Sequence, residues 1–135
     1  MAKKKKKKPE PEIDIKQRLD NVKVLVESNR AKEAIAYIYL VYDDLINIKF
    51  KKPRLAHQTI REFAIKCVNE LEKKLKPESV YPFIKKIEDI IYGGVEPTNK
   101  ELNFTIDLFS NIYNEITGKT ISFKIWNFLI KNFNK

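Results

Sequence analysis

The sequence predicts an all-α protein, a single-domain bundle of five or six short amphipathic helices built from helical hairpins. Three observations support this fold class. Apolar residues recur every three or four positions in successive segments, which is the spacing of one helical face. Two segments open with the T-x-x-E pattern of a helix capping box. The 135 residues include only three glycines, and 43% are hydrophobic and 33% charged, as in a globular chain with a core of its own.

The first two predicted helices form a hairpin. The first begins near Ile13, and its inward face is predicted to be Ile15, Leu19, Val22 and Val26. Ser28 and Asn29 interrupt this pattern, and either residue is suited to cap the helix that follows. The inward face of the second helix is predicted to comprise Ala34, Ile35, Ile38, Val41, Tyr42, Leu45 and Ile48. Because the turn between them is short, we expect the two helices to be antiparallel.

Residues 57–64, HQTIREFA, place the chain's only histidine beside a hydroxyl and a carboxylate. Such a trio fits either the remains of a catalytic site or the start of a helix. Thr59 and Glu62 have capping-box spacing, and an apolar-periodic run follows them. Thr98 and Glu101 repeat the same arrangement later in the chain. We therefore interpret all four residues as structural helix caps and His57 as an exposed residue.

Three further helices follow from the same spacing. The third carries the apolar face Ile60, Phe63, Ala64, Cys67, Leu71 and Leu75, the fourth Val80, Ile84, Ile87 and Ile91, and the fifth Leu102, Ile106, Phe109, Tyr113 and Ile116. The fourth is expected to run from near Ser79 to Tyr92, with Pro82 in its first turn. Gly93 or Gly94 is predicted to end it, and Gly118 to end the fifth.

The domain boundaries are predicted at residues 12 and 118. Residues 1–11 are expected to be a disordered basic arm, because Lys3, Lys4, Lys5, Lys6, Lys7 and Lys8 repel one another and two prolines follow them. These six lysines supply most of the formal net charge of +9 and form the predicted polyanion-binding site. The alternative is that the arm only aids solubility.

Residues 119–135 are predicted to be an aromatic and basic C-terminal helix or tail. We expect it to fold onto the core as a helix, although the segment also contains a strand-like alternation of apolar residues. It has four lysines and no acidic residue, so an interfacial membrane helix is the alternative. Its candidate membrane or partner surface comprises Phe123, Lys124, Trp126, Phe128, Lys131 and Phe133.

No catalytic, metal-binding or cofactor site is predicted, and no small-molecule substrate is expected. One histidine and one cysteine fall short of a zinc site, and no HExxH, CxxC, EF-hand or phosphate-loop pattern occurs in the sequence. Cys67 lies on an apolar stripe and is interpreted as a small core residue. Adjacent acidic residues diverge by about 100° on a helix, so Asp43–Asp44 and Glu88–Asp89 are predicted to be solvated faces.

Residues 16–116 resemble an uncharacterised helical domain found at the cytoplasmic C-terminus of membrane-anchored transglutaminase-like proteins. Four segments carry the resemblance in order: AKEAIAYIYLVYDDL, HQTIREFA, IEDIIYGG and PTNKELNFTIDLF. This chain departs from the family in its lysine run and its aromatic tail, and in having no apolar run of membrane-spanning length and no transglutaminase-like part. The resemblance implies a small helical module that works beside a membrane or against other proteins, and it implies no activity.

Together these observations predict a non-enzymatic interaction module in the cytoplasm. Its expected partners are a protein, a nucleic acid or a ribosome, with the polylysine arm supplying attachment through charge. The alternative is a peripheral membrane adaptor that uses the basic arm and the aromatic tail on an anionic membrane surface.

Overall fold

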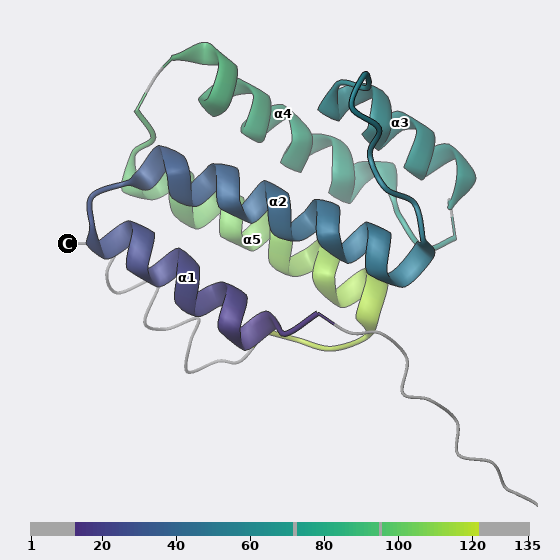
Figure 1. Ribbon diagram of the computed structural model, residues 1–135, viewed down its shortest axis with the longest axis horizontal. Helices are drawn as coiled ribbons and strands as arrows, with labels where there is room; N and C mark the ends of the chain where they lie inside the picture. The colour runs from purple at the N-terminus through teal and green to yellow at the C-terminus, as the bar shows by residue number, and fades with distance from the viewer. Residues whose placement is uncertain (1–12, 72, 95, 122–135) are drawn as a thin grey trace, which may run out of the picture.

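The computed structural model describes residues 13–71, 73–94 and 96–121 (Figure 1). Over these ranges the secondary structure is entirely helical, which confirms the all-α prediction. The helices are α1 (Ile15–Glu27), α2 (Ala31–Phe50), α3 (Ile60–Glu70), α4 (Pro77–Gly93) and α5 (Asn99–Thr117). The predicted basic arm, and the predicted sixth helix with the rest of the tail after Ile121, lie outside the described residues.

Helix α2 lies at the centre of the bundle and contacts α1, α4 and α5, while α4 also packs against α3 and α5. Helices α2, α3 and α5 run in one direction, and α1 and α4 run in the opposite direction (Figure 1). The C-terminal ends of α2 and α3 and the N-terminal end of α4 therefore share one end of the bundle. Helix α1 also begins toward that end.

The core is a single cluster of buried apolar side chains contributed by all five described helices. A row of aromatic rings crosses its centre from α2 through α4 to α5, in the order Tyr39, Tyr42, Phe83, Phe109 and Tyr113. Successive ring centroids are 5.7, 5.3, 6.3 and 6.2 Å apart, and the rings are tilted against each other. Tilted pairs at these distances stabilise a core beyond their buried area alone.

Both predicted capping boxes are present. At the start of α3 the Glu62 amide donates to Thr59 Oγ1 over 3.0 Å, and the Thr59 amide donates to Glu62 Oε1 over 2.9 Å. At the start of α5 the Glu101 amide and Thr98 Oγ1 are 3.1 Å apart, and the Thr98 amide and Glu101 Oε1 are 2.9 Å apart. Gly118 ends α5 in the left-handed conformation with φ of 74°, as predicted.

The start of α4 differs from the prediction, and its end distinguishes the two glycines that were predicted to end it. Gly93 is the last helical residue, and Gly94 takes the left-handed conformation that ends the helix, with φ of 71°. Helix α4 also begins earlier than predicted, with Pro77 in its first turn. Pro82 consequently lies inside the helix and not in its first turn, because two additional residues precede the expected start.

The turn between α1 and α2 also corrects the prediction, since neither Ser28 nor Asn29 caps α2. The Ser28 hydroxyl donates backward to the Val24 carbonyl over 2.8 Å, and Asn29 has a left-handed φ of 62°. Arg30 occupies the N-cap position without a side-chain hydrogen bond to the helix. The two expected capping residues are therefore used to end α1 and to reverse the chain.

Two inward faces are also corrected. Helix α3 ends at Glu70, so Leu75, which was predicted on its apolar face, lies in the connection to α4 and is fully buried there. On α4, Ile90 is buried and Ile91 only half-buried. Among the described residues, no helix combines the length and the hydropathy needed to cross a bilayer.

Candidate polyanion-binding surface

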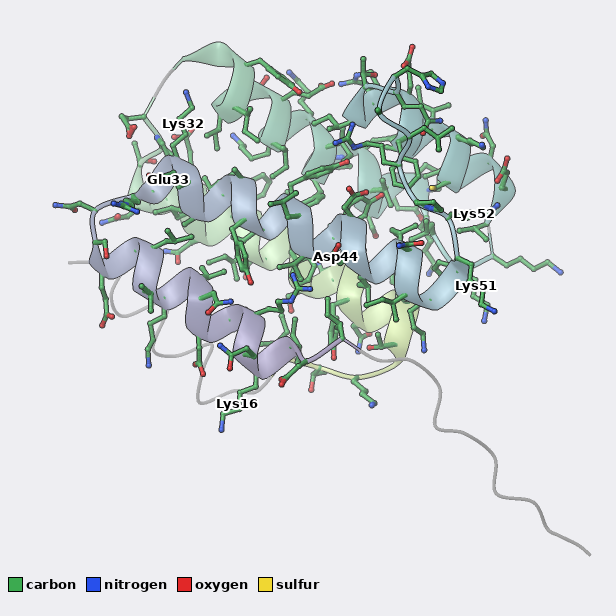
Figure 2. The ribbon with its side chains drawn as sticks, in the orientation of Figure 1. Lys16, Lys32, Glu33, Asp44, Lys51 and Lys52 are labelled. Carbon is green, nitrogen blue, oxygen red and sulfur yellow. The ribbon has the colours of Figure 1, made fainter. Side chains whose placement is uncertain are left out.

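Five lysines gather where α2 and α3 end and α4 begins, and we call them the lysine end. They are Lys51, Lys52, Lys73, Lys74 and Lys76. The first two directly follow α2, and the other three lie in the connection between α3 and α4. Figure 2 shows Lys51 and Lys52 at this end of the bundle, with Lys32 and Glu33 at the opposite end of α2.

An ion pair joins the two chain segments that form the lysine end. Lys52 Nζ lies 2.6 Å from Glu70 Oε1. The hydrogen bond between them raises the pKa of Lys52 and lowers the pKa of Glu70. The pair is partly exposed, with 32% and 42% of the two side chains accessible to solvent. It fixes the α2–α3 connection beside the end of α3.

The other four lysines of this surface have no acidic partner among the described residues. Lys51, Lys73, Lys74 and Lys76 are all exposed. Within the described ranges Glu70 pairs with Lys52, Glu78 lies in the first turn of α4, and Glu115 of α5 accepts a hydrogen bond from the Ser79 hydroxyl near the start of α4. No carboxylate of the described residues forms an ion pair with these four lysines, so the surface carries an excess of positive charge.

A buried leucine holds the lysines of the α3–α4 connection outward. The amides of Lys74 and Leu75 donate to the Leu71 carbonyl over 2.7 and 2.8 Å, which forms a tight turn after α3. Leu75 is 0% exposed and belongs to the core cluster. Because the turn is anchored from inside, Lys73 and Lys74 are presented to solvent from a fixed backbone.

The N-terminus of α4 adds positive potential at the same place. Lys76 is the N-cap residue, and its side chain makes no capping hydrogen bond. The unpaired amides at the start of a helix carry a partial positive charge. Glu78 in the first turn partly offsets this charge. The net effect favours an anion, since the lysines outnumber the carboxylates here.

Arg54, the remaining basic residue of the α2–α3 connection, has a structural role. Its Nη1 donates to the Gln58 carbonyl over 2.9 Å, and its Nε lies 3.8 Å from Asp43 Oδ2. Burial raises the pKa of Asp43, and Arg54 opposes that shift. Arg54 thus holds the loop 55–58 against α2 instead of facing a ligand.

The acidic pairs predicted to be solvated faces are instead ion-paired. Asp43, whose side chain is only 19% exposed, lies near Arg54, and Asp44 accepts a hydrogen bond from Arg18 Nη2 over 2.7 Å. Arg61 of α3 likewise contacts both carboxylate oxygens of Glu88 on α4, at 2.6 and 3.1 Å. These carboxylates connect neighbouring elements, which sequence spacing within one helix does not reveal.

The candidate chemical groups do not form a reaction centre in the described part of the chain. His57 is exposed in the α2–α3 connection, whereas Cys67 is buried in the core. Desolvation raises the pKa of Cys67 to about 11, although Lys52 works against the shift. The thiol is therefore protonated at neutral pH and a poor nucleophile. No group of three or more metal-ligating side chains occurs among the described residues.

The predicted polyanion site, Lys3 to Lys8, lies outside the described residues, as do Phe123, Lys124, Trp126, Phe128, Lys131 and Phe133. Sequence reasoning missed the lysine end. The signal was available as two basic runs, KFKKPR after the second helix and KKLK after the third. Combining them required knowing that α2 and α3 end on the same side.

No protein-family model matches the chain, and comparisons with curated proteins and with solved structures find none that is significantly similar. The resemblance to the helical domain of transglutaminase-like membrane proteins stays a prediction.

Proposed function

We propose that this protein is a non-enzymatic helical accessory module of the cytoplasm that binds a nucleic acid, free or within a ribosome, as a polyanion. One observation carries the proposal: four unpaired lysines, Lys51, Lys73, Lys74 and Lys76, stand together at the end of the bundle where α2 and α3 end and α4 begins. The six lysines of residues 3–8 add further positive charge to the chain.

The chemistry of this surface favours attachment without sequence readout. A lysine ammonium is a compact point charge that contacts phosphate oxygens well but lacks the planar fork that arginine offers to bases. Each neutralised phosphate releases counterions, so binding is expected to weaken steeply as salt rises. We infer the class of partner, a polyanion, from the positive charge of this surface. An acidic protein surface would meet the same requirement, so the experiment must distinguish it from a nucleic acid.

The test measures binding of the full chain to a labelled duplex and to a labelled single-stranded RNA at about 50 to 200 mM salt. The decisive variant is Lys73→Gln with Lys74→Gln, which removes two exposed charges without touching the core. The matched control is Lys32→Gln with Lys85→Gln; both changes lie outside the lysine end, and Lys32 is at the opposite end of α2.

We expect the decisive variant to bind severalfold more weakly and to flatten the log–log salt slope by up to about 1.8, at about 0.9 per lost duplex phosphate contact. The control, which has the same net charge, should retain most of the affinity and slope. Equal loss in both variants would mean that total charge and not this surface governs binding. Absence of binding at the lowest salt would overturn the proposal.

A second candidate function, a peripheral membrane adaptor, is favoured by the composition of residues 119–135. That segment has four lysines, no acidic residue and several large aromatic and aliphatic residues, which suits an interfacial helix. Sedimentation with anionic vesicles tests it against neutral vesicles of the same size. Binding that needs anionic lipid and Trp126 together would favour this candidate over the nucleic acid.

A further inference from the structure

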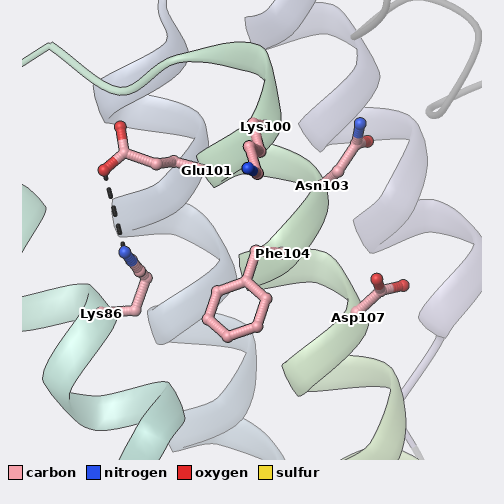
Figure 3. Close-up of a pocket in the computed structure, with 6 residues that line it drawn as sticks. All are labelled: Lys86, Lys100, Glu101, Asn103, Phe104 and Asp107. Atoms are coloured by element: carbon pink, nitrogen blue, oxygen red, sulfur yellow. Dashed lines mark ion pairs between the residues drawn. The ribbon is translucent and has the colours of Figure 1, made fainter.

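A shallow groove of about 470 Å³ lies on the outer side of α5, beside α4 (Figure 3). Its centre is Phe104, a large aromatic side chain that is 47% exposed. Lys86 of α4 closes one side, with Nζ 5.6 Å from the Phe104 ring centroid and 3.8 Å from Glu101 Oε2. This side of the groove is therefore already paired within the chain.

The charged residues on the other side of the groove have no ion-pair partner within the described chain. Lys100, Phe104 and Asp107 are spaced by four and three residues, so they follow one stripe of α5. Neither Lys100 nor Asp107 has an ion-pair partner among the described residues. They cannot pair with each other, because seven residues separate them by about 10 Å along the helix. Burial also raises the pKa of Asp107, so its carboxylate would gain from a cation.

We propose that a second copy of this chain docks on this stripe, with the two α5 helices antiparallel about a two-fold axis at Phe104. Antiparallel pairing reverses the order of the stripe. Lys100 then faces Asp107 of the partner subunit, Asp107 faces Lys100 of the partner subunit, and the two Phe104 rings meet at the axis. The site is incomplete without the second copy, because the second copy supplies both missing counter-charges and covers Phe104.

Self-complementarity is what selects a second copy as the occupant. A two-fold interface requires that one patch be complementary to itself, and a cation four residues before a central aromatic with an anion three residues after it meets that requirement. An unrelated partner would have to present the mirror arrangement by coincidence. Because one helix face falls short of the roughly 1,000 Å² of a stable interface, the dimer should be weak, with Kd in the micromolar range or above.

The experiment follows the mass of the full chain in solution, by light scattering or sedimentation, up to about 1 mM protein at low salt. The subunit mass is 16.0 kDa, and we expect a concentration-dependent rise toward twice that value. The variants are Lys100→Asp, Asp107→Lys, the double variant with both changes, and Phe104→Ser. Lys32→Asp on α2 is the charge-reversal control, and circular dichroism verifies the fold of every variant.

Each single reversal places like charges opposite each other twice, so Kd should rise by at least about tenfold. The double variant restores opposite charges across the axis and should return Kd to within about threefold of the parent. Phe104→Ser should weaken the dimer, and Lys32→Asp should leave it unchanged. A monomer at every concentration, or single reversals without rescue in the double variant, would overturn the proposal. These measurements are made without nucleic acid, so their outcome is independent of the proposed function.

Discussion

Lys52 Nζ and Glu70 Oε1 lie 2.6 Å apart, and this ion pair connects the end of α2 to the end of α3 across eighteen residues of chain. Its two members belong to the candidate polyanion surface with opposite effects. Lys52 contributes a positive charge, and the carboxylate of Glu70 neutralises that charge. The pair therefore orders the surface while reducing the charge available to a ligand.

Replacing Glu70 with Gln should tighten nucleic-acid binding severalfold, because it removes a carboxylate and releases Lys52.

The same change should slightly lower the free energy of unfolding, and the direction of the pH dependence of this effect follows from two pKa shifts. The pKa of Glu70 is lowered from 4.5, so the stability that the ion pair contributes is present above pH 4.5 and is lost as the pH falls through the lowered pKa. The pKa of Lys52 is raised from 10.5, so the contribution is lost again as the pH rises through the raised value.

Urea unfolding of the parent and of Glu70→Gln at several pH values measures this effect. The difference in unfolding free energy should be present between about pH 5 and pH 10 and decrease as the pH falls through the lowered pKa of Glu70. A difference that persists unchanged at the acidic end would contradict the ion-pair explanation.

The two adjacent glycines after α4 should respond in opposite directions to alanine. Gly94 has φ of 71°, where a Cβ is strained, so Gly94→Ala should destabilise the protein by about 1 kcal/mol. Gly93 is helical, and a Cβ there meets nothing within 4 Å, so Gly93→Ala should stabilise by about 0.5 to 1 kcal/mol. Thermal unfolding of the two variants compares them directly. The reverse order would place the cap at Gly93.

The capping threonine of α3 should matter more than the histidine beside it. Thr59→Ala removes the acceptor of the Glu62 amide and should cost about 0.5 to 2 kcal/mol of unfolding free energy. His57→Ala changes an exposed side chain and should be nearly neutral in stability and in nucleic-acid binding. Loss of binding in a well-folded His57→Ala variant would show that HQTIREFA has a functional role.

The features that were predictable from sequence are those with local causes. A capping box is complete within four residues, and a helical face repeats every three or four, so both Thr59 and Thr98 and most of the core positions were identified. The choice between Gly93 and Gly94 and the error at Ser28 and Asn29 have local causes as well. Gly93 and Gly94 were equally suited to end α4, and only the backbone dihedral angles distinguish them. Ser28 and Asn29 were both suited to cap α2, but Arg30 occupies the N-cap position.

The lysine end was not predictable in the same way. The nine residues from 51 to 59 separate α2 from α3, which is long enough to let α3 run parallel to α2 instead of forming a hairpin. The ion pairs that fix the elements span 18 residues in Lys52–Glu70 and 27 in Arg61–Glu88. Contacts at this separation depend on the packing of the whole bundle and leave no periodic signal.

The emission of Trp126, the chain's only tryptophan, should locate the C-terminal tail. If the tail packs on the core as predicted, the free protein emits at a blue-shifted wavelength, and Trp126→Ala costs about 3 to 5 kcal/mol. The measurement is made with and without anionic vesicles. A blue shift that appears only with vesicles, together with unchanged stability of Trp126→Ala, would favour the membrane adaptor instead.

Deleting residues 2–8 should separate the contribution of the arm from that of the folded lysine end. Six lysines on duplex phosphates give a log–log salt slope of about −5 if all of them engage, so the full chain should lose roughly a thousandfold in affinity between about 50 and 200 mM salt. The deletion should flatten this slope and leave the melting temperature nearly unchanged, because residues 3–8 are all lysines and offer no large apolar side chain to a core. The residual slope belongs to the body, and adding Lys73→Gln and Lys74→Gln should reduce it further. If the double substitution has no effect in the deleted chain, the lysine end makes no phosphate contacts and the arm alone accounts for binding.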